Sequence, residues 1–175
     1  MKTIILVRHA KSSWKDPSLD DFDRPLNKRG KMNAQFMGGK LKERQIMPDL
    51  VLSSPAKRAR KTATAFAKAI GYPKKKIVFD DNMYHASSRY LIEIIRNIDD
   101  KYETIMLFGH NPDLNGLANI LLNNNPVDNI VTAGVYCIKV NVNQWQNMRE
   151  WKGESVFYDY PKRYQVDTKH FMDQS

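Results

Sequence analysis

The stretch Ile4-Ile5-Leu6-Val7-Arg8-His9-Ala10 runs a short apolar segment directly into a histidine. The stretch Ile105-Met106-Leu107-Phe108-Gly109-His110-Asn111 does the same in the second half of the chain. Short apolar runs of this kind are typical of strands buried in a parallel sheet. The carboxyl ends of parallel strands open on one edge of the sheet, where ligands bind in α/β proteins. If the two strands are neighbours, His9 and His110 face the same pocket.

Helical and strand-like patterns alternate between and beyond these two segments. Asn27 is placed to cap a helix, and Ser54 with Pro55 predicts the N-cap and first position of a second helix that ends at Gly71. Further strands are expected at residues 50–52, 77–79, 135–142 and 155–158, and further helices at residues 88–98 and from 111 through 121. The inward stripes of the first two helices are predicted to be Met32, Phe36, Met37 and Leu41, and Ala59, Ala63, Phe66, Ala67 and Ile70.

This alternation predicts an α/β fold. We expect three layers (α/β/α), with a mainly parallel sheet, helices on both faces and one antiparallel strand at an edge. A chain of 175 residues is within the usual range for one domain, so residues 1–175 are predicted to form a single domain. The charged tail after about residue 161 is expected to be poorly ordered.

The composition is that of an ordinary soluble protein, with 42% hydrophobic and 27% charged residues. No apolar run approaches the roughly 20 residues that span a bilayer, and the first apolar run is too short for a signal peptide. We therefore expect a cytoplasmic protein with no membrane partner. The single Cys137 excludes an internal disulfide and is interpreted as a small buried side chain.

The formal net charge is +9, which favours anionic partners. The densest basic clusters are Lys57-Arg58, Arg60-Lys61 and Lys74-Lys75-Lys76. They lack the interleaved aromatic residues of single-strand binding surfaces, and no DNA-reading motif is present. Solvated helix and loop faces explain the clusters better, so nucleic-acid binding is not expected.

The residues at the predicted sheet edge suit phosphoryl transfer. A neutral imidazole can attack phosphorus and carry the group covalently, and His9 is the predicted nucleophile. The phosphoryl oxygens then need cationic stabilisation, which Arg8 and Arg58 can supply, with His110 as a second imidazole contact. Each residue alone could be purely structural. The prediction depends on three strand ends delivering them to the same edge.

The motifs Leu6-Val7-Arg8-His9-Ala10, Ser54-Pro55 with Arg58-Ala59 and Thr62, and Gly109-His110-Asn111 resemble the histidine phosphatase superfamily, which includes the phosphoglycerate mutases. The segment Arg24-Pro25-Leu26-Asn27 with Gly30 is similar, more narrowly, to SixA-like phosphohistidine phosphatases. The resemblance covers Met1 to about Tyr136. It implies a phosphoglycerate mutase-like fold, a phosphorylated His9, and a phosphate pocket containing Arg8, Arg58 and His110. It also implies that Arg24 contacts the anionic substrate.

The sequence departs from the family pattern after the first histidine, where Ala10 and Lys11 replace a common glycine and acidic residue. Mutase-like relatives also carry an acidic proton donor between the middle arginine and the second histidine. This sequence has no clear counterpart of that donor. The interval contains His85 and Asp80-Asp81, although an exposed turn would also explain these residues. We expect His85 to border the substrate. An imidazole leaving group needs less acid assistance than an alkoxide, which favours a phosphohistidine substrate.

Other phosphatase chemistries fit poorly. Asp21-Phe22-Asp23 is not preceded by an apolar strand, and Cys137 is followed by Asn143 where a cysteine phosphatase needs arginine. No metal or organic cofactor is expected, because the histidines form no close ligand pair and no phosphate-binding glycine loop is present. The predicted partner is a phosphorylated protein or a small phosphorylated substrate. Three functions remain: a phosphohistidine phosphatase, a small-molecule phosphomonoesterase or mutase, and a non-catalytic module that binds phosphorylated ligands.

Overall fold

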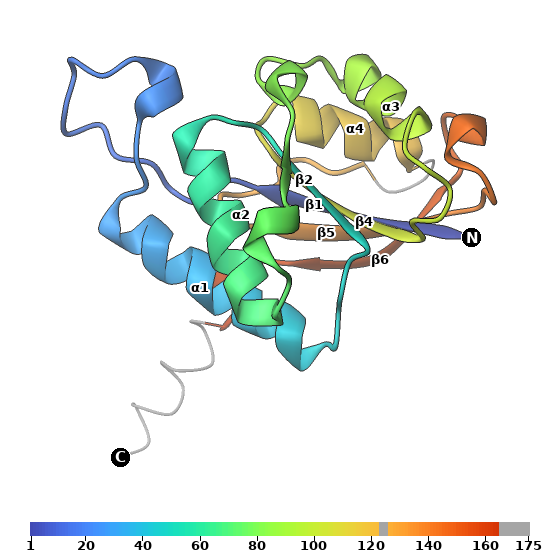
Figure 1. The fold of residues 1–175 in the computed structure, drawn as a ribbon, viewed down its shortest axis with the longest axis horizontal. Helices are drawn as coiled ribbons and strands as arrows, with labels where there is room; N and C mark the ends of the chain where they lie inside the picture. Colours follow the sequence, from blue (N-terminus) through green and yellow to red (C-terminus); the bar gives the residue numbers. More distant parts are fainter. Residues whose placement is uncertain (123–125, 165–175) are drawn as a thin grey trace.

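A six-stranded sheet forms the centre of the molecule (Figure 1). The computed structural model describes residues 1–122 and 126–164. The strands lie in the order β3-β2-β4-β1-β5-β6. Their bounds are Lys2–Arg8 for β1, Leu50–Ser53 for β2, Val78–Phe79 for β3, Thr104–Gly109 for β4, Val135–Val140 for β5 and Gly153–Asp159 for β6.

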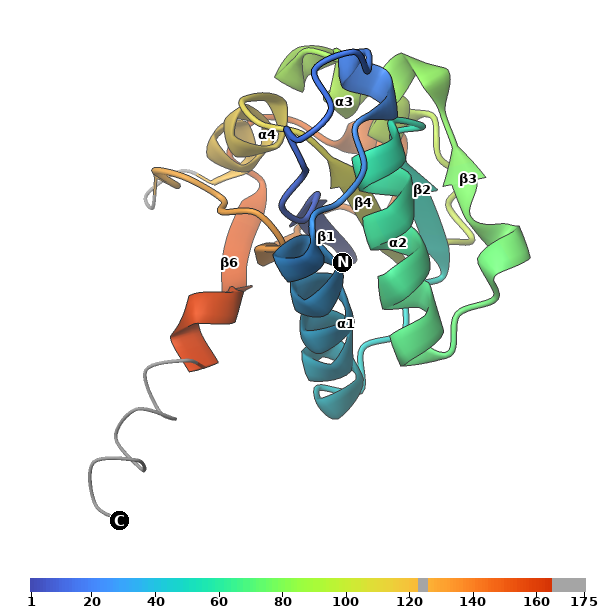
Figure 2. The same cartoon turned by 90° about the vertical axis from the view of Figure 1, so that its left-hand side faces the viewer.

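Four helices cover the two faces of this sheet, which confirms the predicted three-layer α/β fold (Figures 1 and 2). On one face lie α1 (Lys28–Glu43) and α2 (Lys57–Ile70), and on the other lie α3 (Ser88–Arg96) and α4 (Asp113–Leu121). Alternate residues of β1 explain the two cores: Ile5 and Val7 pack toward α1 and α2, whereas Ile4 and Leu6 pack toward α3 and α4. The short 3-10 helices are η1 (Asp21–Asp23), η2 (Lys74–Lys76), η3 (Asp81–Met83) and η4 (Trp145–Asn147).

The strand pairings are mostly parallel, with one correction to the expected topology. Strand β1 pairs in parallel with β4, as the two histidine segments predicted, and β2 pairs in parallel with β4 and β3. Strand β5 runs antiparallel, but it is not at the edge, because it lies between β1 and β6 and pairs antiparallel with both. Its reversed direction arises because the chain enters β5 at the carboxyl end of β1, where the Ala133 amide donates to the Arg8 oxygen at 3.1 Å, and then runs back along β1.

The helix ends follow the sequence signals in two cases and not in a third. The Asn27 side chain accepts a hydrogen bond from the Gly30 amide and caps α1, and Gly71 adopts the left-handed conformation that ends α2. The prediction that Ser54 caps α2 is wrong, since the helix begins at Lys57 and Ala56 occupies the cap position. The Ser54 hydroxyl is instead within hydrogen-bond distance of the His110 ring.

The predicted buried stripe is correct for α2 and partly wrong for α1. Met37 and Leu41 are buried, but Met32 and Phe36 are exposed. The face of α1 that meets the sheet and α2 carries small residues instead, namely Gly30, Ala34 and Gly38. A methyl group on Gly38 would stand 2.8 Å from the Ala69 side chain of α2, so the helix pair approaches too closely there for larger residues.

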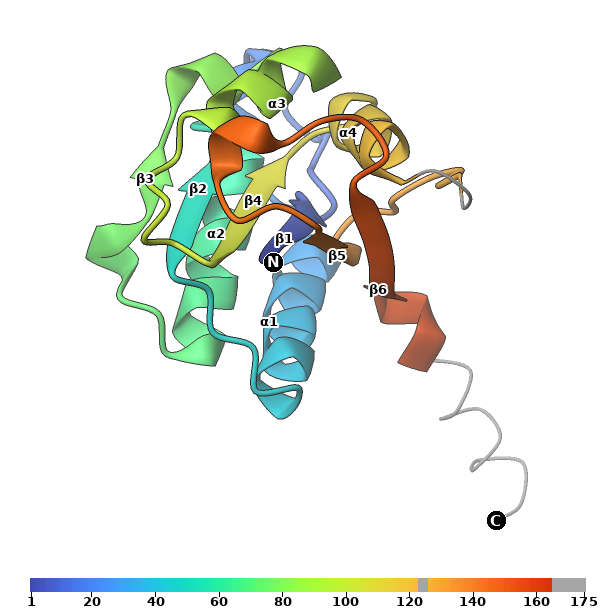
Figure 3. The same ribbon diagram turned by 90° about the vertical axis from the view of Figure 1, so that its right-hand side faces the viewer.

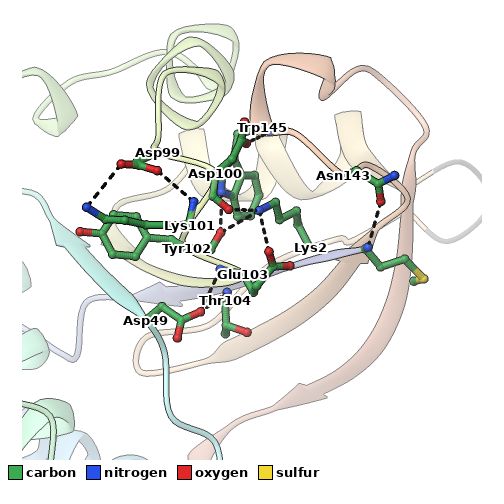
Figure 4. Close-up of polar contacts among 11 residues, drawn as sticks. Lys2, Asp49, Asp99, Asp100, Lys101, Tyr102, Glu103, Thr104, Asn143 and Trp145 are labelled. Atoms are coloured by element: carbon green, nitrogen blue, oxygen red, sulfur yellow. Dashed lines mark hydrogen bonds and ion pairs between the residues drawn. The ribbon is translucent and has the colours of Figure 1, made fainter.

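A buried lysine holds together the edge of the sheet at the amino ends of β1 and β4, the edge that faces the viewer in Figure 3; Figure 4 shows the contacts of this lysine. The Lys2 ammonium donates to the backbone oxygens of Asp100 and Tyr102 and pairs with Glu103 at 3.1 Å. The Trp145 indole donates to the same Tyr102 oxygen. Because these contacts satisfy a cation that is 1% exposed, they stabilise the end of the sheet opposite the two histidines.

Three further expectations concern the C-terminal tail, Cys137 and membrane-spanning helices. Residues 161–164 form a helical turn, and the Tyr164 hydroxyl donates to buried Asp159. This part of the tail is therefore ordered, contrary to the expectation. Residues 165–175 lie outside the described residues. Cys137 is buried and free, and burial raises its pKa to about 11. None of the helices in residues 1–122 and 126–164 has the length and apolar character needed to cross a bilayer.

Candidate active site

The carboxyl ends of β1, β2 and β4 meet at one edge of the sheet, which Figure 2 shows from the front. His9 follows β1, Ser54 follows β2 and His110 follows β4. The centroids of the His9 and His110 rings are 5.2 Å apart, and the rings are tilted by 51°. The parallel pairing of β1 with β4 therefore brings the two sequence-predicted histidines together.

The His9 ring is held in a defined orientation. Its Nδ1 lies 2.8 Å from the Ala10 carbonyl oxygen, and its backbone amide donates to the Gly109 oxygen at 3.0 Å. Because a carbonyl can only accept, Nδ1 carries the proton and Nε2 keeps its lone pair. Burial, aided by the positive charges of Arg58, Arg8 and Arg24, lowers the pKa of His9 to about 4. The ring is therefore neutral at neutral pH, with the lone pair of Nε2 unprotonated.

The backbone behind His9 is fixed by α1 and α2. The Thr62 hydroxyl accepts from the Ala10 amide at 2.9 Å and donates to the Arg58 carbonyl at 2.7 Å. Gly30, in the first turn of α1, packs against the backbone of Lys11, where a Cβ would stand 2.1 Å from the Lys11 oxygen. These contacts fix the segment that follows His9 relative to both helices.

His110 is largely buried and lies beside His9. Its Nε2 lies 2.8 Å from the Ser54 hydroxyl, and its Nδ1 is buried without a hydrogen-bond partner in the described structure. Burial, together with the nearby His9 and Arg58, lowers the pKa of His110 to about 3. A bound anion would act in the opposite direction and favour the protonated ring.

Three arginines surround His9, and each keeps an unpaired donor. Arg58 and Arg24 are 6% and 8% exposed, and Arg8 is partly buried, which lowers its pKa. Within the described residues, Arg8 Nε, Arg24 Nη1 and Arg58 Nε are buried without a hydrogen-bond partner. A buried donor without a partner costs about 1–3 kcal/mol, and more when it is charged, so three such donors near one imidazole suit the binding of an anion.

The other nitrogens of these arginines are held by the protein itself. Arg8 Nη1 donates to the Ile130 carbonyl at 3.0 Å. Arg58 donates to both the backbone oxygen and the carboxylate of Asp21, at 2.6 and 3.0 Å, and Arg24 contacts the same carboxylate at 3.3 Å. The guanidinium of Arg24 also stacks on the Trp14 ring at 3.5 Å. The cations are thus oriented before any substrate binds.

The charge of this cluster matches a phosphoryl group. Three guanidiniums and the Asp21 carboxylate leave a net charge of +2 around two neutral imidazoles. A hydrogen bond from the Tyr84 hydroxyl, at 2.6 Å, and the two arginines lower the pKa of Asp21 to about 2, so it remains ionised. A dianion would neutralise the cluster.

The rim of the pocket contains Tyr84 and His85. The centroid of the Tyr84 ring is 5.8 Å from that of His110 and 3.9 Å from that of His85. His85 is exposed and has a φ of 60°, a left-handed conformation that is uncommon for residues other than glycine. The structure therefore places His85 beside the site at its outer border, separated from His110 by Tyr84.

The structure brings together five residues that the sequence pointed to: Arg8, His9, Arg24, Arg58 and His110. It adds Asp21, Ser54 and Tyr84, which sequence reasoning did not assign to the pocket. Asp21 stands three residues before Arg24 in a polar loop, and nothing in its local pattern shows that it meets Arg58.

Fold and site together define a phosphoryl-transfer enzyme: a neutral imidazole with a free Nε2, at the carboxyl edge of an α/β sheet, surrounded by unsatisfied cationic donors. Comparison with known proteins gives the family. The sequence model of the histidine phosphatase superfamily (branch 1) matches residues 4–84. The chain belongs to this superfamily, and it is a phosphatase of the histidine-nucleophile type.

The similar curated proteins include one from Arabidopsis thaliana and one from Mycobacterium tuberculosis. An uncharacterised chloroplastic protein of A. thaliana is 37% identical over 128 residues, which are 69% of this chain and 59% of that protein. The chain thus spans less than two thirds of that relative. An uncharacterised protein of M. tuberculosis is 30% identical over 165 residues, 89% of this chain and the whole of that protein.

Solved structures support the SixA-like resemblance. A candidate phosphohistidine phosphatase SixA from Agrobacterium tumefaciens has a TM-score of 0.78 and 27% identity, covering 91% of this chain and 98% of that one. The protein histidine phosphatase SixA in complex with tungstate has a TM-score of 0.76, covering 93% and 99%. At 17% identity, the second comparison establishes the shared fold alone.

Proposed function

We propose that this phosphatase removes phosphate from phosphohistidine in proteins, with His9 as the residue that becomes phosphorylated. The observation that carries the proposal is the hydrogen bond between His9 Nδ1 and the Ala10 carbonyl. This hydrogen bond leaves Nε2 unprotonated, so its lone pair is available to attack phosphorus. The unpaired donors of three arginines are available for the phosphoryl oxygens.

The first step transfers the phosphoryl group between two imidazoles. His9 Nε2 attacks phosphorus, the N–P bond of the substrate breaks, and the electron pair of that bond returns to the substrate ring. When the far nitrogen of that ring is protonated, the ring leaves as a neutral imidazole and needs no proton at the breaking bond. His9 becomes an N-phosphoimidazolium whose Nδ1–H still donates to the Ala10 oxygen.

The second step is hydrolysis of this intermediate. A water oxygen attacks phosphorus, the bond to Nε2 breaks with its electron pair returning to His9, and the water protons leave with inorganic phosphate and solvent. His9 returns to its starting tautomer. The arginines and His110 hold the three phosphoryl oxygens in both steps, which is where charge must be stabilised.

The state of Asp21 supports the choice of a phosphohistidine substrate. Phosphate esters release an alkoxide, which gains much from a positioned acid. Asp21 is the carboxyl group held against the pocket arginines, and with a pKa of about 2 it has no proton to donate at neutral pH. Transfer from an imidazole avoids that requirement.

Hydrolysis of small phosphomonoesters is the second candidate, and His85 is the observation that favours it. An imidazole at the rim of the pocket, with its ring tilted by 41° against that of Tyr84, could protonate an alkoxide leaving group. Relatives also include a 2,3-bisphosphoglycerate-dependent phosphoglycerate mutase of Chelativorans, 34% identical over 80 residues.

The two candidates make different predictions for the purified protein. Turnover of a phosphohistidine peptide is compared with turnover of p-nitrophenyl phosphate and 3-phosphoglycerate, for the wild type, His9→Ala and His85→Ala. We expect kcat/KM for the peptide to exceed that for either ester, with acid-labile labelling that is lost in His9→Ala and unaffected in His85→Ala. Equal turnover of esters, with loss of ester turnover in His85→Ala, would favour the second candidate. Labelling that persists in His9→Ala would exclude His9 as the nucleophile.

A further inference from the structure

A basic groove separates the N-terminal halves of α1 and α2. It encloses a hollow of about 450 Å³, and its walls carry Lys31 from α1 and Lys57 and Lys61 from α2. Lys57, Lys61 and Ala65 stand four residues apart, so they line one face of α2. The floor is apolar and contains Leu26, Ala34 and Ala65.

The three lysines of this groove are not neutralised. In the described part of the chain, no carboxylate lies within ion-pair distance of Lys31, Lys57 or Lys61, although several other lysines and arginines have such partners. The lining of the groove contains no acidic residue. Three uncompensated ammonium groups around an apolar floor attract an anionic partner that also has apolar surface.

The groove adjoins the phosphate pocket through two chain connections. Arg24, which lines the pocket, is followed by Pro25 and Leu26, which line the groove. On the other side, Lys57 directly precedes Arg58. A partner whose phosphorylated residue reaches His9 can therefore rest on the groove with an adjacent part of its surface.

We propose that this groove docks an acidic, amphipathic helix of the phosphorylated substrate protein. The proposal rests on the proposed function and specifies the surface of the protein that carries the phosphohistidine. Carboxylates of the helix pair with Lys31, Lys57 and Lys61, and its apolar side chains cover Leu26 and Ala34. A helix lying in a groove in this way is a common mode of peptide recognition.

The lining favours an acidic protein over a nucleic acid. Base stacking needs exposed aromatic rings, and this groove has none among its lining residues. Its floor is formed by aliphatic side chains, which suit the apolar face of a helix. A phosphodiester backbone would leave that floor uncovered.

The test uses three probes with the full-length protein. They are a helical phosphohistidine peptide rich in glutamate, the same peptide with glutamine in place of glutamate, and phosphorylated free histidine. For the wild type we expect kcat/KM to be about tenfold higher for the acidic peptide than for the neutral one, equivalent to about 1.4 kcal/mol. The combined variant Lys31→Gln, Lys57→Gln, Lys61→Gln is expected to abolish this preference, while turnover of free phosphohistidine stays unchanged.

The chain offers a matched control in η2. The combined variant Lys74→Gln, Lys75→Gln, Lys76→Gln removes the same charge from exposed lysines beyond the far end of α2, a helix about 20 Å long. We expect this variant to keep the preference for the acidic peptide. An equal loss in both variants would mean that only overall charge matters, and would overturn the docking site.

A binding measurement distinguishes a failure of the docking proposal from a failure of the proposed function. Affinity for the unphosphorylated acidic peptide, measured by fluorescence anisotropy, does not depend on turnover. Binding that is lost in the groove variant but not in the control supports docking even if no phosphohistidine is hydrolysed. No difference between acidic and neutral peptides, or an oligonucleotide that displaces the acidic peptide with a steep salt dependence, would overturn it.

Discussion

Asp21 holds Arg58 at two points, with its backbone oxygen 2.6 Å from Nη1 and its carboxylate 3.0 Å from Nη2. These contacts occupy the outer nitrogens of the guanidinium and leave Nε unpaired. The same carboxylate contacts Arg24, which keeps its Nη1 unpaired. An exposed residue of η1 thus determines which donors of two buried arginines remain available for substrate.

Replacing Asp21 is expected to lower kcat without weakening anion binding. In Asp21→Asn, the arginines lose their charged anchor, and kcat should fall about tenfold because small errors in positioning are costly. Affinity for inorganic phosphate should not weaken, because the pocket gains one net positive charge. Asp23→Asn, in the same 3-10 turn, is the control and should behave as wild type. Equal kinetics in the two variants would contradict a positioning role for Asp21.

Arg58→Lys is expected to lose activity although it keeps its charge. A lysine ammonium cannot donate to Asp21 and to a phosphoryl oxygen in the planar arrangement that a guanidinium allows. Loss of a preorganised donor of this kind lowers kcat by about 100- to 1,000-fold. Steady-state kinetics with a phosphohistidine peptide measure the effect, and Arg60→Lys, at an exposed position of the same helix, provides the comparison. Near-normal turnover in Arg58→Lys would remove this residue from the phosphate pocket.

The two histidines make both stability and activity sensitive to acid. Their pKa values are about 4 and about 3 in the folded protein, against a usual value of 6.5, because burial disfavours the charged ring. Unfolding therefore takes up protons below pH 6.5, and the stabilising contribution is lost as the pH falls from about 6.5 through 4 to 3. The Tm of the wild type should fall over this range.

A variant of His110 and the pH profile of activity test the origin of this pH dependence. His110→Gln has no titrating group at this position and keeps His9, so its Tm should fall less steeply between pH 6.5 and 4 than that of the wild type. For activity, kcat/KM should hold down to about pH 4 and fall below it, as His9 becomes protonated. A pKa near 6.5 for His9 in the substrate-free protein, measured by NMR titration, would show that the ring is not held neutral.

Much of the fold could be predicted because local signals and tertiary packing agree. The apolar segments before His9 and His110 form neighbouring parallel strands, and Asn27 and Gly71 mark helix ends as predicted. The errors arise where long-range contacts decide. Ser54 has the local features of an N-cap, but its hydroxyl meets His110 from another strand, and α2 begins later.

The residues of the site fall into the same two groups, those predictable from local sequence and those positioned by long-range contacts. Residues at strand ends, such as His9 and His110, can be placed from the sequence because the topology of a parallel sheet fixes where they meet. Asp21 and Tyr84 come from loops whose paths depend on the assembled molecule, and each acquires its role through partners distant in sequence. Periodicity contains no information about such contacts.

Two glycines of α1 test how the segment behind His9 is positioned. A Cβ at Gly30 would collide with the backbone oxygen of Lys11, so Gly30→Ala should destabilise the protein by about 1–3 kcal/mol and lower kcat by displacing the segment that follows His9. A methyl group added at Gly39, in the same helix, would meet no atom of the described residues within 4 Å, and Gly39→Ala should stabilise the protein by up to about 1 kcal/mol through helix propensity. Chemical denaturation measures both changes. Because the substitution is identical and only the surroundings differ, a stabilising Gly30→Ala would show that α1 does not rest on the Lys11 backbone.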